Sequence, residues 1–431
     1  MKIIIIAVLC LLLIGGFLFW KFAPPVKNPL GPKVVTLTYW DLWEDDNLIK
    51  PVVAQYQILH PNITINLVRQ SLTNYRTRVQ TQIRAGSGPD IFMIHNSWLP
   101  MFSQDLAPAP SSKFSLGDYQ NTFYPVAVEA FIKDNKILAA PTQINGLALY
   151  INEDILNGVG LKPPKNWGEF MDMATKMTVV DPNGTIKTAG AAMGITANVD
   201  YWSDILGLLL LQQPGIDLKA TPVKVATPSV AEVVRFYTGF ALDPKRKTWD
   251  VSMPNSTDAF IQGRLAMYFA PFEKASQIRK LNPNLKFKVV PVPQLANRNI
   301  SWATFWAQAV SLKSAHPQEA WDFIKYLTSQ EAEKSFGQPY SRVDLANDLA
   351  SDPLVGAFIT QGPNYKFWYL SSNTFDNGIN DEMIKVWEDG IKAILKSTDP
   401  QVALQQVEQG TRQILDKYTK PAPAASGQNN N

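Results

Sequence analysis

Residues Ala85–Ile94 read Ala-Gly-Ser-Gly-Pro-Asp-Ile-Phe-Met-Ile, and this stretch decides the fold of the chain. A turn of Gly, Ser and Pro that leads into an unbroken apolar run predicts a loop entering a fully buried strand. Buried parallel strands end at a crevice, which is where open α/β sheets bind their ligands. His95, Asn96 and Trp98 follow this strand, so we expect them to form part of a binding cleft.

Strand and helix patterns alternate on both sides of this stretch. A period of two over residues 35–39 and again over 63–67 predicts two strands, and helical spacing over 48–59 predicts a helix between them. Tyr75–Arg84 predicts a second helix, which leads into the strand at 89–94. This order of elements indicates an α/β unit with a mainly parallel sheet.

The pattern begins again after Pro141, which indicates a second α/β lobe joined to the first by more than one crossing of the chain. After Pro141 the sequence predicts strands at 146–151, 262–269 and 301–312 and a helix at Trp167–Met177. A further helix is predicted to start at Pro317, and the chain is expected to return to the first lobe near its end.

Composition limits the classes of protein to which the chain can belong. It has 431 residues, 46% of them hydrophobic, which is enough for two domains with separate cores. The net charge is +3 and the basic residues are scattered, so nucleic acid is not an expected partner. No phosphate-binding Gly-rich loop and no motif of a zinc or serine hydrolase is present, and we expect no cofactor and no metal.

The amino-terminal end is apolar from Ile3 to Trp20, a run that would span roughly 27 Å as a helix. Pro24 is a poor context for signal cleavage, so residues 1–23 are predicted to be an uncleaved membrane anchor, with the folded domain outside the cytoplasm. The sole cysteine, Cys10, lies inside this run and is not placed as a lipoprotein cysteine. Residues 24–33 are predicted to be a linker and residues 419–431 a disordered tail.

Five motifs resemble, in order, those of family 1 extracellular solute-binding proteins, the sugar receptors of bacterial ABC importers. Together they cover almost all of residues 34–418. They are Gly86–Asp90, similar to the family's Gly-x-x-Pro-Asp turn; Pro141–Asn152, similar to its hinge strand; Asn166–Phe170, similar to a Thr-Trp-Asp-Glu-Phe helix start; Phe260–Met267; and Glu319–Phe323.

The resemblance implies a type II periplasmic-binding-protein fold, in which two lobes close around a ligand. It places residues 34–141 and 300–328 in an N-lobe, and residues 142–299 and 329–418 in a C-lobe. It also implies a carbohydrate ligand, permease subunits of an ABC transporter as partners, a monomer and no enzymatic activity. The sequence departs from the family pattern at the anchor, which replaces the lipid-attachment motif, and at Ser301–Trp306, where many relatives have glycines.

A sugar site needs aromatic rings for the apolar faces of the ligand and polar side chains for its hydroxyls. The chain has 12 tryptophans, more than a core is expected to need, and several lie beside polar residues at predicted strand ends. The candidate ligand-binding residues are Trp40, Asp41, Trp43, Glu44, Asp45, His95, Asn96, Trp98, Gln143, Trp202, Phe272, Glu273, Trp302, Trp306, Tyr340 and Arg342.

Other interpretations of these residues remain open. Trp40 can belong to the strand core, and Trp302 and Trp306 can either line the cleft or fill the hinge core. Arg342 can pair with Asp344, while Asp90 is expected to brace its turn. Trp167 and Trp321 lie on helical patterns and are assigned to packing.

Two other functions compete with solute binding. A polysaccharide-degrading enzyme would need two carboxylates flanking the bond, for which Glu44, Asp45 and Glu273 are candidates. A membrane-anchored surface protein could use the same fold to bind peptide or polymer. The family resemblance favours the solute-binding receptor.

Overall fold

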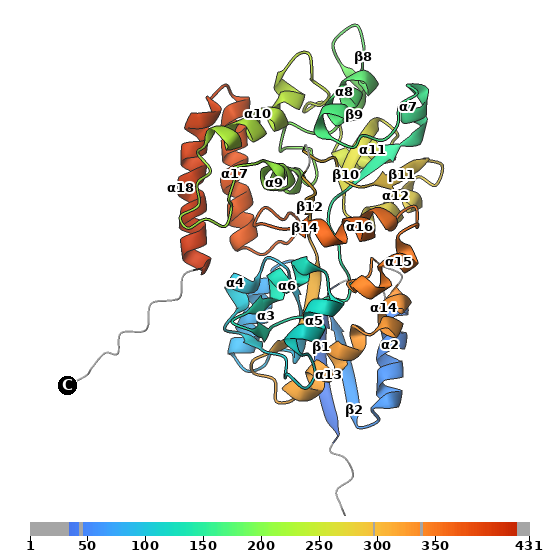
Figure 1. Cartoon of the computed structure of the whole chain (residues 1–431), viewed down its shortest axis with the longest axis vertical. Coiled ribbons are helices and arrows are strands. Elements are labelled where there is room, and N and C mark those ends of the chain that lie inside the picture. The colour runs from blue at the N-terminus through green and yellow to red at the C-terminus, as the bar shows by residue number, and fades with distance from the viewer. Residues whose placement is uncertain (1–33, 43–45, 296–297, 337–338, 420–431) are drawn as a thin grey trace, which may run out of the picture.

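The chain forms two lobes, one above the other in Figure 1. The computed structural model describes residues 34–42, 46–295, 298–336 and 339–419. One cluster of buried apolar side chains is built on residues 35–144 and 303–332 with Tyr365, and a separate cluster on residues 147–292 and 357–414 with Trp302. Two cores of this kind confirm the predicted two-lobed α/β architecture.

The sheet of the N-lobe begins as the sequence predicts. Strand β1 pairs in parallel with β2 and with β3, whereas β13, which lies between β3 and β4, pairs antiparallel with both. Asp90, in the turn before β3, accepts hydrogen bonds from the Thr38 amide and the Ser314 hydroxyl, so it braces the turn as expected. The strand order is β2 (Ile63–Arg69), β1 (Val35–Asp41), β3 (Ile91–His95), β13 (Trp306–Ser311) and β4 (Leu106–Ala107).

The sheet of the C-lobe corrects the prediction that both lobes have mainly parallel sheets. Only the β10–β9 pair is parallel, whereas β10–β7, β11–β7 and β8–β9 are antiparallel. The cause is the hinge: β7 starts there and runs away from it, while β10 runs back and ends there, with Ala148 opposite Ala270. The order is β11 (Phe287–Val290), β7 (Ala148–Asn152), β10 (Leu265–Ala270), β9 (Ile186–Ala191) and β8 (Val179–Val180).

Helices cover both sheets, and those predicted at Tyr75–Arg84, Trp167–Met177 and from Pro317 are confirmed. The N-lobe helices are α2 (Asp46–Leu59), α3 (Tyr75–Arg84), α4 (Leu99–Phe102), α5 (Leu116–Thr122), α6 (Pro125–Phe131), α13 (Pro317–Leu327) and α14 (Gln330–Phe336). Those of the C-lobe are α7 (Glu153–Gly158), α8 (Trp167–Met177), α9 (Trp202–Gln212), α10 (Pro228–Leu242), α11 (Ser256–Ile261), α12 (Glu273–Leu281), α16 (Gly356–Gln361), α17 (Ile379–Leu395) and α18 (Pro400–Thr419).

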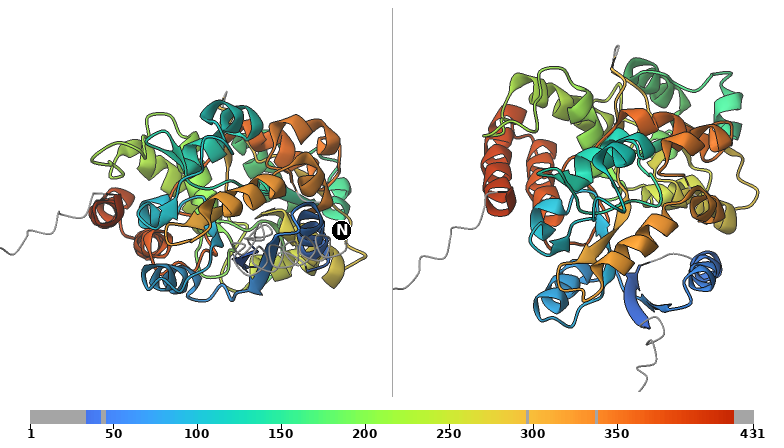
Figure 2. Two further views of the ribbon diagram at one scale, coloured as in Figure 1. Left: turned by 90° about the horizontal axis from the view of Figure 1, so that it is seen from below. Right: turned by 60° about the horizontal axis from the view of Figure 1, so that its bottom comes forward.

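Short elements complete the chain at the lobe junction and on the N-lobe surface. They are the hairpin β5 (Ile132–Lys133) and β6 (Lys136–Ile137), the pair β12 (Ser301–Trp302) and β14 (Tyr365–Lys366), helix α15 (Ala346–Leu349), and the 3₁₀ turns Val343–Leu345 and Gly362–Asn364. Helices α17 and α18 lie side by side along one edge of the C-lobe (Figure 1 and Figure 2).

The segment 301–312, predicted as one strand, is two strands in different sheets. Strand β12 pairs with β14 at the junction of the lobes, and after a break at residues 303–305 strand β13 joins the N-lobe sheet. The break exists because the chain crosses between the lobes here. Gly146 passes Trp302 so closely that a Cβ atom at residue 146 would lie 1.9 Å from the Trp302 carbonyl oxygen.

Some of the predicted segments lie partly or wholly outside the described residues. The anchor at 1–23 and the linker at 24–33 lie outside the described residues, and of the predicted tail only Thr419 is described, as the last residue of α18. In the part of the chain that the structure describes, no helix combines the length and apolar character needed to cross a bilayer. Ala332 of α14, assigned above to the C-lobe, packs in the N-lobe core.

Candidate functional site

The carboxyl end of β3 lies where the N-lobe meets the crossing segment. His95 pairs with Trp306 at the start of β13, and the two rings are 5.2 Å apart and nearly perpendicular. Trp98 packs against Trp306 at 4.8 Å and has no exposed surface. These three predicted site residues are therefore together, but their rings form core rather than a free binding surface.

Hydrogen bonds determine the tautomer of His95. The Ser97 amide donates to Nδ1, so Nε2 carries the proton and donates to the Thr304 hydroxyl at 3.0 Å. Burial lowers the pKa of His95 to about 3, which keeps the imidazole neutral. The hydroxyl of Ser97 lies 2.7 Å from Nδ1 and accepts from the Asn380 amide of the C-lobe. A neutral histidine thus connects both lobes to the crossing segment.

Asn96 differs from its neighbours because one of its polar groups has no partner. Its Oδ1 accepts from the Phe305 amide at 3.0 Å, and its own backbone amide donates to the Phe305 carbonyl. Its Nδ2 is buried with no hydrogen-bond partner among the described residues. A buried unpaired donor is costly unless a ligand or water meets it.

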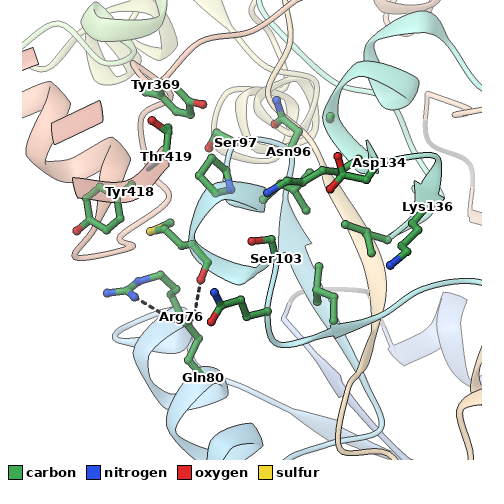
Figure 3. A pocket seen from close by; sticks show the side chains of 18 of the residues that line it. Arg76, Gln80, Asn96, Ser97, Ser103, Asp134, Lys136, Tyr369, Tyr418 and Thr419 are labelled. Atoms are coloured by element: carbon green, nitrogen blue, oxygen red, sulfur yellow. Dashed lines mark hydrogen bonds between the residues drawn. The ribbon is translucent and has the colours of Figure 1, made fainter. Parts of the chain in front are cut away.

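Asn96 and Ser97 line a cavity of about 960 Å³ between the lobes (Figure 3). This volume is large enough for a small oligosaccharide. Arg76, Gln80 and Ser103 line its N-lobe side. The C-lobe contributes Tyr369, Tyr418 and Thr419. The wall therefore combines polar side chains with aromatic and aliphatic ones.

The C-lobe brings its own strand end to the same junction. Strand β10 ends at Ala270 and leads to Phe272, which is half-buried, and Glu273, which is exposed. Asn145 holds both: its Nδ2 donates to the Glu273 carboxylate at 2.9 Å and its Oδ1 accepts from the Phe272 amide at 3.1 Å. The Asn145 carbonyl accepts from the Thr304 amide. A chain of contacts thus joins the end of β10 to that of β3.

Trp202 and Trp302 both pack in the C-lobe core, although Trp302 lies in a range assigned above to the N-lobe. Trp302 is fully buried, and its indole donates to Asp204 at 2.9 Å. Its ring lies against Gly207, where a Cβ atom would be 2.4 Å from the ring. Burial raises the pKa of Asp204 to about 6, although the Ser372 and Trp302 hydrogen bonds oppose this. Trp202, the first residue of α9, is also buried.

The end of β1 is only partly described. Trp40 is half-buried against the N-lobe core. Asp41 is fully buried, and Arg69 pairs with its carboxylate at 3.2 Å. The predicted residues Trp43, Glu44 and Asp45 lie outside the described residues.

The remaining candidates gather elsewhere on the junction. Gln143 forms an isolated bridge with Tyr340, which is buried. Arg342 binds Asp344 at 2.9 and 2.7 Å and donates to the Thr328 carbonyl. The alternative pairing of Arg342 with Asp344 is thus confirmed, and its guanidinium is engaged within the protein.

The number of tryptophans proved a poor guide to the site. Of the ten in the described part of the chain, all but Trp40 are buried, because large rings fill the two cores. The buried ones are Trp98, Trp167, Trp202, Trp249, Trp302, Trp306, Trp321, Trp368 and Trp387.

Sequence reasoning also missed residues that the structure brings to the junction. Asn145 lies inside the hinge motif quoted above, but a single Asn gives no signal of its role. Thr304 was not singled out, because the segment around it is dominated by aromatic residues. Phe375 is 53% exposed in a loop before α17, with a φ of 46° that is unusual for a bulky residue.

Comparison with known proteins agrees with this architecture. A putative binding protein of Brucella abortus is 23% identical over 293 residues, which cover 67% of this chain and 70% of that protein. The maltotriose-binding protein of Pyrococcus abyssi is 22% identical over 327 residues, which cover 72% of this chain and 65% of that protein.

Solved structures share the fold. The sugar-binding protein MalE of Xanthomonas citri superposes with a TM-score of 0.73 at 17% identity, covering 89% of this chain and 98% of that one. A cyclo/maltodextrin-binding protein complexed with maltotetraose gives 0.71 at 18% identity, with the same coverage. Residues 52–364 match the family described as bacterial extracellular solute-binding protein. Since this match spans more than half of its length, the chain belongs to the bacterial extracellular solute-binding protein family.

Proposed function

We propose that this protein is an extracytoplasmic solute-binding receptor that closes its two lobes on a sugar or oligosaccharide and delivers it to the permease of an ABC importer. The ligand lies at the ends of β3 and β10, against Asn96, Phe272 and Glu273. The amino-terminal anchor holds the receptor, a monomer, at the cell membrane. The receptor has no enzymatic activity of its own.

The observation that carries the proposal is the unpaired amide of Asn96. Its Nδ2 is buried and Asn96 lines the cavity between the lobes, so a ligand hydroxyl that reaches this nitrogen would satisfy it. Phe272 and Glu273 lie outside the lining of this cavity, at the end of β10 on the C-lobe, and would add an aromatic face and a carboxylate. Aromatic rings beside hydrogen-bonding groups are the chemistry that sugars require.

The relatives support carbohydrate as the class of ligand. Structures with this fold include complexes with cycloalternan and maltotetraose, and one curated relative is a maltotriose-binding protein. Another relative is a probable ABC transporter-binding protein of Deinococcus radiodurans, which supports a permease as the partner.

A thermal-shift screen tests this proposal, because a ligand that binds only the folded state raises the unfolding temperature. The screen compares mono- and oligosaccharides, polyols and short peptides. A shift with at least one carbohydrate and none with peptides is the expected result. A shift with peptides alone would support the surface-scaffold alternative and overturn the sugar proposal.

The enzymatic alternative has its own test. Overnight incubation with oligosaccharides, followed by chromatography, would reveal cleavage by Glu273 and a second carboxylate. We expect the oligosaccharides to be recovered intact, and products that disappear in a Glu273→Gln variant would contradict the assignment as a receptor.

A further inference from the structure

The loop 372–378, which leads into α17, has an unusual backbone. Asn373, Phe375 and Asn377 alternate along it with φ values of 58°, 46° and 45°, a conformation that residues other than Gly rarely adopt. Such a loop persists only where its surroundings hold it in place.

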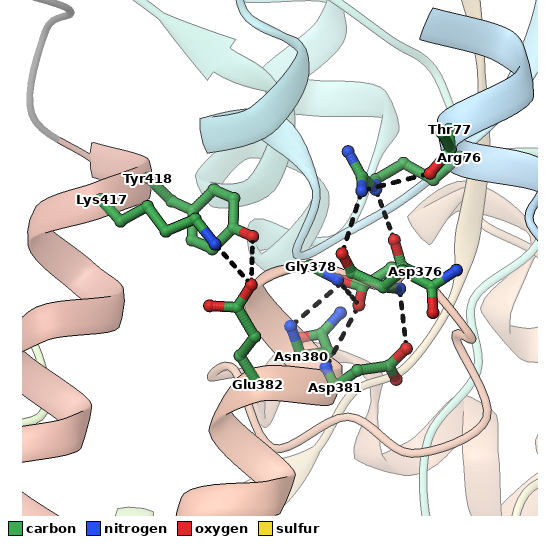
Figure 4. A network of polar contacts seen from close by, with 10 residues as sticks. Arg76, Thr77, Asp376, Gly378, Asn380, Asp381, Glu382, Lys417 and Tyr418 are labelled. Carbon is green, nitrogen blue, oxygen red and sulfur yellow. Dashed lines mark hydrogen bonds and ion pairs between the residues drawn. The ribbon is translucent and has the colours of Figure 1, made fainter.

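Contacts within the C-lobe hold the ends of this loop. Asp376 is fully buried and accepts hydrogen bonds from the amides of Gly378, Asn380 and Asp381 (Figure 4). Asp381 accepts from the Asn377 amide at 2.7 Å. These bonds leave the carbonyl groups of residues 376 and 377 directed at the other lobe.

Arg76, at the start of α3 in the N-lobe, binds both of these carbonyls. Its Nε donates to the Asp376 oxygen at 2.5 Å and its Nη2 to the Asn377 oxygen at 3.0 Å. A third nitrogen donates to Gln80 at 2.8 Å, one turn along the same helix, which fixes the guanidinium plane. Asn377 also donates to the Asn74 side chain at 2.7 Å.

The loop packs closely against the N-lobe. A Cβ atom at Gly378 would lie 2.6 Å from the sulfur of Met101 and 3.4 Å from Nε of Arg76. The guanidinium also lowers the pKa values of Asp376 and Asp381, opposing the larger effect of their burial. The contact between the lobes therefore combines shape, hydrogen bonding and charge.

We propose that Arg76 is a positioning residue, which holds the loop 372–378 against the N-lobe and thereby stabilises the arrangement of the two lobes in which this contact forms. When the lobes separate, the loop loses the only bonds from the described residues of the N-lobe to its carbonyls at 376 and 377. The planar fork of an arginine can bind two neighbouring carbonyls at once, which a lysine cannot do.

Helix α3 supplies a matched control. Arg78 also donates to carbonyl oxygens, those of Ser71 and Thr73, but both belong to its own lobe. Replacing Arg78 therefore removes a similar set of hydrogen bonds from α3 and leaves the contact between the lobes unchanged. A difference between the two variants isolates the contribution of that contact.

Fluorescence energy transfer between the lobes tests the proposal in the full chain. Cys10→Ser removes the single cysteine, and Ser112→Cys and Lys176→Cys provide one exposed label on each lobe. Without any ligand, Arg76→Ala and Arg76→Lys should both lower the transfer efficiency, whereas Arg78→Ala should leave it at the parent value. A merely structural role in α3 would lower the unfolding temperature of all three variants and leave the efficiency unchanged.

Two results would overturn the proposal: an unchanged efficiency in Arg76→Ala, or an equal decrease in Arg78→Ala. Because no ligand is added, either result would leave the assignment as a sugar receptor intact.

Discussion

The imidazole of His95 donates a hydrogen bond to the hydroxyl of Thr304 at 3.0 Å, and this bond connects the end of β3 with the segment that crosses between the lobes. His95 has almost no exposed surface, and its other nitrogen faces Ser97, which in turn accepts from Asn380 of the C-lobe. The geometry works only for the neutral ring, because Nδ1 must accept a hydrogen bond. The hinge therefore depends on the protonation state of one histidine.

Acid should destabilise the protein through His95. Its folded-state pKa of about 3 is below the ordinary value of 6.5, so between these pH values the unfolded chain binds the extra proton. The free energy of unfolding should fall as the pH falls through this window, by up to about 1.4 kcal/mol per pH unit. Denaturant unfolding of the wild type and of His95→Gln at several pH values measures this slope.

His95→Gln should have a flatter pH profile than the wild type over pH 3–6.5. Ser97→Ala is the matched control, because it removes a hydrogen bond to the ring but keeps the titrating group. Equal slopes in the wild type and His95→Gln would contradict the prediction.

Glu333 should act in the opposite direction. It is buried in α14, and burial raises its pKa to about 8, from the ordinary value of 4.5. Its Oε1 accepts from the Ser341 hydroxyl at 2.5 Å and its Oε2 from the Ser341 amide at 3.0 Å, and these bonds oppose the rise without cancelling it. Stability from this group is complete below pH 4.5 and lost as the pH rises through 8.

Glu333→Gln keeps a donor and an acceptor at this position and should flatten the decline of unfolding free energy between pH 4.5 and 8. Glu331→Gln, on an exposed carboxylate of the same helix, should retain the decline because Glu333 is intact. A decline that persists in Glu333→Gln would show that another group is responsible.

Gly146→Ala should severely damage the hinge. The added methyl would lie 1.9 Å from the Trp302 carbonyl oxygen, a backbone atom, so one of the two crossings would have to shift. We expect a loss of at least about 3 kcal/mol in unfolding free energy, or no folded protein. Gly117→Ala, where nothing lies within 4 Å of the new methyl, should cause no loss. A stable Gly146→Ala variant would mean that the two crossings are farther apart.

Trp302→Ala should lower the unfolding free energy by about 3–5 kcal/mol, because it empties a fully buried site and removes the indole donor from Asp204. Trp40→Ala, at a half-buried position, should cost less. Chemical denaturation of both variants makes the comparison, and equal losses would contradict the placement of Trp302 in the C-lobe core.

Local patterns predicted most of the helices and strands. Tyr75–Arg84 and Trp167–Met177 have the predicted bounds, because amphipathic spacing and flanking turn residues act within one turn of helix. The segment 301–312 was predicted as one strand, since its break depends on the chain crossing to another lobe. The antiparallel pairing of β7 with β10 depends on the earlier crossing, where the chain enters the C-lobe before Ala148, and no local pattern records that crossing either.

The candidate site was harder to predict than the fold. Residues at the ends of β3 and β10 do lie at one junction, as their positions after buried strands indicated. However, Trp98 and Trp306 face the core, and aromatic residues give the same sequence signal in a core as in a pocket. The bridging roles of Asn145 and Thr304 arise from contacts between segments more than 100 residues apart.

Calorimetric titration of an oligosaccharide identified in the screen tests the central claim most directly. The wild type should bind one molecule per chain, and Phe272→Ala should bind it about tenfold more weakly or not at all, while remaining folded. Tyr369→Ala is the comparison variant, because it changes the cavity wall and leaves the end of β10 intact. The absence of heat with every carbohydrate, or undiminished binding by Phe272→Ala, would contradict a sugar site at the ends of β3 and β10.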